Sequence, residues 1–132
     1  SLGRAVEMAA RDWSARRNFV IEQLRKLPEQ PRGIRHVLAE LMARDKDRIE
    51  ANLEIMKNWY RDLAVCSAAP ELLYNRDLSD QVRKTGSRTA MDQILEKTDA
   101  IAAAEKALTT NANARLVMDR LVEALAAQGG KT

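Results

Sequence analysis

The histidine and cysteine content of the chain restricts the chemistry that it could perform. The 132 residues include one histidine, His36, and one cysteine, Cys66. A metal site of the helical-bundle type needs Glu-x-x-His pairs from facing helices, and one histidine cannot build that site twice. A cysteine nucleophile needs an activating base, and His36 is the one candidate for Cys66. The sequence therefore predicts no catalytic residue, no metal site and no cofactor.

Both residues have simpler interpretations. His36 lies beside Arg35 and Val37 on an expected helix, where we interpret it as a solvated or capping histidine. Cys66 lies on the apolar side of another expected helix, which is typical of a small buried hydrophobe. The sequence has no phosphate-binding glycine loop and no cysteine cluster for zinc. The stretches "RDKDR" and "NRDLSD" lack the ligand spacing of a calcium loop, so we expect them to be solvated helix ends.

Two adjacent aromatic residues, Trp59 and Tyr60, should point about 100° apart around a helix. Either both pack inside one domain, or one of them anchors a subunit or domain interface, where aromatic residues are enriched. The nearby Asp62 is expected to pair within the helix, with Asn58 or Lys57.

Composition favours a single helical domain. The hydrophobic content of 45% rests mainly on aliphatic residues, and the chain has only five glycines and five Trp, Tyr and Phe residues. The net charge of +3 is small and evenly spread, so we expect little direct DNA binding. A lone cysteine fits a reducing cytoplasm. No apolar run approaches the roughly 20 residues of a membrane span, so a cytoplasmic location and no membrane partner are predicted.

The spacing of apolar residues predicts helices in the first half of the chain. Residues 1–27 should form two helices, or one kinked helix, because the apolar stripe loses its phase between Arg11 and Ser14. Pro31 is expected as the first residue of the next helix. That helix should carry five apolar residues on one face: Ile34, Val37, Leu38, Leu41 and Met42.

The second half continues the helical pattern. Residues 43–69 carry the strongest stripe, and residues 71–88 are the least regular, with a break at Gly86. A long helix should follow Ser87. In the last helix Asn113, or Asn111 if the helix begins earlier, can accept from the free backbone amides of the first turn. We therefore expect an all-α bundle of about five or six helices with short connections.

Three segments carry a family resemblance. They are "SLGRAVEMA", then "WYRDLAV" with the following "LLYNRDL", and finally "NANARLVMDRLVEAL". The first looks like a "GSxGRAL" helix, the second like "W-x-RDL" and "LxNxDL" stretches, and the third like "NVNPRLALExLLL". Together they resemble the C-terminal part of the bacterial clamp-loader delta-prime subunit of DNA polymerase III. The three segments lie in the family's order and span nearly the whole chain.

The resemblance implies a collar-type bundle with a role in DNA replication. Residues 1–12 would end the AAA+ lid-domain helix, and residues 13–132 would be the C-terminal helical collar domain that holds the clamp-loader ring together. The partners would be the gamma/tau and delta subunits, and the chain would support sliding-clamp loading. The interface residues that we expect are Trp59, Tyr60, Arg61 and Arg115.

The same resemblance implies that this chain does not hydrolyse ATP. In ATP-hydrolysing relatives the lid helix places a sensor arginine against the nucleotide, at the position of Gly3 in this sequence. Arg4 is one residue further, which turns it about 100° away on a helix. An alternative class is the ligand-binding helical domain of a transcription regulator, which would require an internal apolar pocket.

Overall fold

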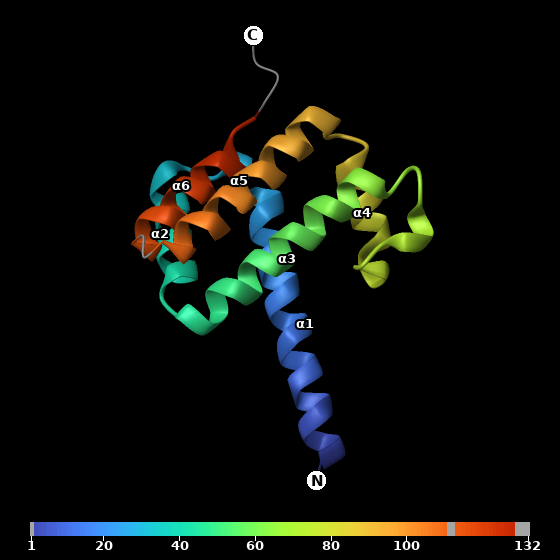
Figure 1. Cartoon of the computed structure of the whole chain (residues 1–132). Helices are drawn as coiled ribbons and strands as arrows, with labels where there is room; N and C mark the ends of the chain where they lie inside the picture. Colours follow the sequence, from blue (N-terminus) through green and yellow to red (C-terminus); the bar gives the residue numbers. More distant parts are fainter. Residues whose placement is uncertain (1, 111–112, 129–132) are drawn as a thin grey trace.

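The computed structural model describes residues 2–110 and 113–128, and within them every regular element is a helix. In these two ranges, six α-helices and three short 3₁₀-helices surround one core (Figure 1). The prediction of an all-α bundle is confirmed. In chain order the elements are α1 (Leu2–Lys26), η1 (Leu27–Glu29), α2 (Arg32–Ala43), α3 (Lys46–Val65), η2 (Pro70–Leu72), η3 (Arg76–Leu78), α4 (Ser79–Gly86), α5 (Met91–Thr109) and α6 (Ala114–Ala126).

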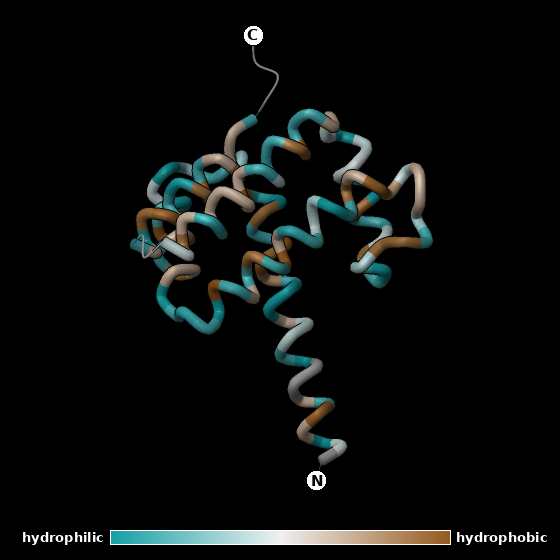
Figure 2. The backbone as a smooth tube through the Cα atoms, viewed as in Figure 1, coloured by the Kyte–Doolittle hydropathy of each residue, from teal (hydrophilic) through white to brown (hydrophobic). Residues whose placement is uncertain are grey.

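Helix α1 is a single unbroken helix, so the alternative of two separate helices joined between Arg11 and Ser14 was wrong. No proline or glycine interrupts that stretch, which leaves the hydrogen-bond ladder intact. The apolar stripe changes phase because the N-terminal half of α1 projects from the bundle, and hydrophobic residues alternate there with polar ones (Figures 1 and 2). α1 passes through residues 12 and 13 without interruption. The expected division of the chain into two domains between these residues stays a prediction.

Helix α3 is the central element of the bundle. It packs against α1, α2, α4 and α5, while α6 packs against α2 and α5. The predicted apolar stripe of α3 is confirmed, since its members are all buried: Ile49, Leu53, Ile55, Met56, Trp59, Tyr60, Leu63 and the following Cys66. Because α3 has neighbours on so many sides, its buried surface extends around most of its circumference.

Helix α2 begins at Arg32 with Pro31 at the N-cap, one residue later than predicted. The expected single apolar face is divided in the structure. Leu38 and Met42 are buried, whereas three other residues of the face are exposed: Ile34, Val37 and Leu41. The helix therefore has a second apolar surface that no described part of the chain covers.

Polar side chains satisfy the backbone at several helix ends. Asp45 caps α3, where its side chain accepts from the Asp47 amide at 3.0 Å. Asn113 caps α6 by accepting from the Leu116 amide at 3.2 Å, which confirms its predicted role. Asn111, the alternative cap, lies outside the described residues. At the other end of α6, the Lys97 Nζ of α5 donates to the Leu125 and Ala127 carbonyl oxygens, at 2.7 and 2.9 Å.

The close approach of α4 to α3 leaves no room for a side chain at Gly86. A Cβ added there would lie 2.7 Å from the Cys66 Sγ and 3.4 Å from the Leu63 carbonyl oxygen. We expect Gly86→Ala to lower the free energy of unfolding by about 1–3 kcal/mol through overpacking. Cys66→Ala should recover part of that loss, which a urea double-mutant cycle would detect. Strictly additive effects of the two substitutions would show that this contact is not the cause.

Candidate functional site

Trp59 and Tyr60, the aromatic pair expected at an interface, lie in the core. Their side chains are 1% and 4% exposed. The two side chains point about 100° apart around α3. Both still meet packed neighbours, because other helices lie on several sides of α3. Burial also raises the pKa of the Tyr60 hydroxyl above its ordinary value. The interface role expected for this pair is therefore corrected to a packing role, and both residues pack inside the domain.

Asp62 holds the irregular segment that follows α3, residues 67–78, against the core through hydrogen bonds. Its carboxylate is fully buried and accepts from the Tyr74 and Asn75 amides, each at 2.9 Å. It also accepts from the Asn75 Nδ2 at 2.8 Å. The hydrogen-bond partners of Asp62 are thus Tyr74 and Asn75, 12 and 13 residues further along the chain, and not the expected Asn58 or Lys57. Three hydrogen bonds offset the cost of burying a carboxylate, while Arg61 lies 3.6 Å away.

The fastened segment presents an exposed group that we call the Tyr74 patch, formed by Arg61, Leu72 and Tyr74. Arg61 donates to the Leu72 carbonyl oxygen, and its guanidinium carbon lies 4.4 Å from the centre of the Tyr74 ring. The Leu72 and Tyr74 side chains are 55% and 63% exposed. Arginine and tyrosine are enriched at interface hot spots, and the exposed leucine beside this stacked pair adds apolar surface that a partner could bury.

A second tie holds the same segment to α1. The Arg17 guanidinium contacts both Asp77 carboxylate oxygens, at 2.8 and 2.6 Å. These hydrogen bonds hold the pKa of Asp77 below its ordinary value. The segment that carries the Tyr74 patch is therefore held to α3 through Asp62 and to α1 through Asp77. Because the segment is already ordered, it would lose less conformational entropy when a partner binds.

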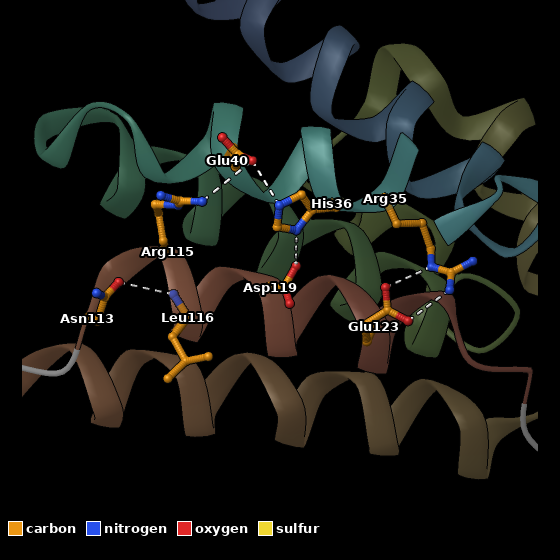
Figure 3. Close-up of polar contacts among 8 residues, drawn as sticks. All are labelled: Arg35, His36, Glu40, Asn113, Arg115, Leu116, Asp119 and Glu123. Atoms are coloured by element: carbon orange, nitrogen blue, oxygen red, sulfur yellow. Dashed lines mark hydrogen bonds and ion pairs between the residues drawn. The ribbon is translucent and has the colours of Figure 1, made fainter. Parts of the chain in front are cut away.

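Helices α2 and α6 are joined by a row of polar side chains (Figure 3). His36 lies between two carboxylates, with Nε2 2.9 Å from Glu40 and Nδ1 3.1 Å from Asp119. Arg115, a predicted interface residue, lies in this row 3.6 Å from Glu40, and its side chain is 65% exposed. His36 thus has a structural position between two helices and is half-exposed.

In the same row, Arg35 donates two hydrogen bonds to the Glu123 carboxylate, with nitrogen–oxygen distances of 2.8 and 2.9 Å. The Arg35 hydrogen bonds lower the pKa of Glu123, so folding favours its ionised form. That stabilisation is present above the ordinary carboxylate pKa and is lost as the pH falls through the lowered value. We expect Glu123→Gln to be less stable than the wild type near neutral pH, with the difference shrinking in strong acid.

Urea titrations across the acidic range would measure this effect. Glu50→Gln is the matched control, because Glu50 is exposed and has no ion pair within the described part of the chain. Its stability should follow that of the wild type at every pH. A Glu123→Gln difference that stayed constant into strong acid would contradict the assigned role of the pair.

Cys66 and His36 have separate structural partners. Cys66 is buried and its Sγ donates to the Leu63 carbonyl oxygen at 3.4 Å, whereas both His36 nitrogens face carboxylates. In residues 2–110 and 113–128, no group of three or more His, Cys, Asp or Glu side chains is placed to hold a metal ion. No helix in these ranges is long and apolar enough to cross a membrane.

Sequence reasoning missed the tie between Asp62 and Asn75 and the exposed position of Tyr74. The available signal was the pairing of "WYRDLAV" with "LLYNRDL", because these are the two segments that the tie connects. Comparison with known proteins found no matching family model, no similar curated protein and no similar solved structure.

Proposed function

We propose that this chain is the collar domain of a delta-prime-type clamp-loader subunit, an assembly module that acts in the cytoplasm without hydrolysing ATP. The ordered resemblance of its three segments supports the proposal, and an all-helical bundle is the fold that a collar requires. An assembly role needs a rigid core and an exposed contact surface, and it needs no reactive group.

The observation that carries the proposal is the tie between Asp62 and Asn75. It connects the two middle segments of the resemblance and holds Leu72 and Tyr74 at the surface. A binding surface that is already ordered loses less conformational entropy on association than a mobile one. The Tyr74 patch takes the place of Trp59 as the proposed subunit contact.

The projecting half of α1 is consistent with this proposal. Val6, Met8 and Trp13 are large apolar residues that stay 61%, 55% and 44% exposed. In a clamp-loader subunit, the lid of an AAA+ module would lie beside this part of the helix. Contact with such a module would remove those side chains from water.

Isothermal titration of the chain with gamma/tau and delta collar domains would test the proposal. We expect micromolar or tighter binding, weakened about tenfold by Tyr74→Ala or Leu72→Asp, which is a loss of about 1.4 kcal/mol in binding free energy. Leu95→Asp is the matched control, because Leu95 on α5 is 54% exposed against 55% for Leu72. Absence of binding at micromolar concentrations would contradict the proposal.

Two surface grooves in the described part of the chain do not fit the effector-binding domain of a transcription regulator. Such a domain binds its ligand in a largely apolar pocket with a few convergent polar groups. Two surface grooves of this chain have volumes of about 580 and 590 Å³, and charged side chains line a large part of each.

A further inference from the structure

An apolar surface on α2 remains uncovered by the described part of the chain. Ile34, Val37 and Leu41 are 48%, 61% and 44% exposed. Their spacing of three and four residues places them on one side of the helix. Phe19 of α1 is 45% exposed and lines the same groove as Leu41. We call Phe19, Ile34, Val37 and Leu41 the α2 docking face.

Basic side chains border one end of this face. The groove beside Leu41 has a volume of about 580 Å³, and its charged lining residues are Arg16, Arg44, Asp45, Lys46 and Arg48. Arg48 lies 3.3 Å from the Asp45 carboxylate, so these two charges offset each other. No other ion pair involves the remaining basic residues within residues 2–110 and 113–128, so their charges are available to a partner. These three residues, Arg16, Arg44 and Lys46, are the basic rim.

We propose that the α2 docking face binds an amphipathic helix of a partner protein, with acidic side chains at the end that meets the basic rim. From Ile34 to Arg44 the surface follows α2 and its C-cap residue for about 15 Å, a length suited to an apolar helix stripe. The apolar face would supply burial, and the rim would fix the direction of the bound helix. The inference stands apart from the clamp-loader proposal, because it uses neither the Tyr74 patch nor the resemblance.

A protein helix fits these observations better than a nucleic acid. The basic rim alone could attract phosphates, but a phosphate backbone would leave Ile34, Val37 and Phe19 in contact with water. A partner helix with apolar residues at a spacing of three and four would cover them. The small net charge of +3 also gives the chain little general attraction for nucleic acid.

Fluorescence anisotropy with labelled synthetic probes would test the proposal on the whole chain. The first probe is a helical peptide of about four turns, with leucines on one side and glutamates flanking them at one end. The second probe carries lysine in place of each glutamate, and the third is a short DNA duplex. We expect the glutamate peptide to bind at least about tenfold more tightly than the other two, a difference of about 1.4 kcal/mol.

Variants of the chain locate the binding. Arg44→Glu with Lys46→Glu should weaken binding of the glutamate peptide about tenfold or more. The matched control, Lys84→Glu with Lys106→Glu, makes the same charge change at exposed positions on α4 and α5. Val37→Asp should abolish binding, while Leu95→Asp should leave it unchanged. Circular dichroism would confirm that each variant keeps its helical fold.

Three outcomes would overturn the inference. The first is no binding of the glutamate peptide at concentrations up to the millimolar range. The second is equal loss of affinity in the rim variant and its charge-matched control. The third is tighter binding of the DNA duplex than of the glutamate peptide, which would make the basic rim a phosphate-binding surface.

Discussion

Replacing Trp59 with alanine is expected to lower the free energy of unfolding by about 4 kcal/mol, within the range for truncating a large buried aromatic residue. The Trp59 side chain is 1% exposed and lies on the central helix α3. Alanine would leave a cavity that the packed neighbours can fill only in part. Urea unfolding followed by circular dichroism measures the change.

Trp13→Ala provides the control for this prediction. Trp13 is the same residue type on α1, but its side chain is 44% exposed. Its removal deletes less buried surface and should cost no more than about 1 kcal/mol. Equal costs for the two substitutions would contradict the placement of Trp59 in the core and would revive its interpretation as an interface anchor.

The second large effect is expected at Asp62. Asp62→Ala removes the acceptor for three hydrogen bonds and deprives the buried Asn75 amide and the partly buried Tyr74 amide of their partner. We expect a loss of about 3 kcal/mol in the free energy of unfolding, since each unsatisfied buried donor costs about 1–3 kcal/mol. Asp62→Asn keeps one acceptor oxygen and should lose less.

Asp80→Ala is the matched control for Asp62. The Asp80 side chain is 95% exposed and pairs with Arg83 at 2.8 Å, a surface pair that should contribute less than about 1 kcal/mol. Backbone amide exchange adds a second measurement, because loss of the Asp62 carboxylate should expose the Tyr74 and Asn75 amides to solvent. Unchanged protection of these amides in Asp62→Ala would show that the carboxylate does not hold the segment.

Helical periodicity predicted the elements that bury one continuous stripe. The stripe of α3 and the cap of α6 at Asn113 are found as expected, because both depend on interactions within a few residues of sequence. The shape of α1 was not predictable in this way. Its apolar stripe loses phase where the helix projects from the bundle, and the same loss could equally indicate a kink.

The candidate site was less predictable than the fold, because it depends on contacts between distant residues. Sequence spacing gives the angle between Trp59 and Tyr60, but it does not give the number of helices that surround α3. Tyr74 lies in a segment without helical periodicity, so no pattern indicated its exposure. Its position depends on hydrogen bonds to Asp62, 12 residues earlier in the chain.

The proposal that this chain is an assembly module of a clamp loader is tested most directly by the mass of the particle that the chain forms with collar domains. Light scattering coupled to size-exclusion chromatography would measure that mass for an equimolar mixture with the gamma/tau and delta collar domains. The proposal predicts a joint complex that Leu72→Asp disrupts and Leu95→Asp does not. Elution of the wild-type chain at its own mass, separate from the other collar domains at micromolar concentrations, would contradict it.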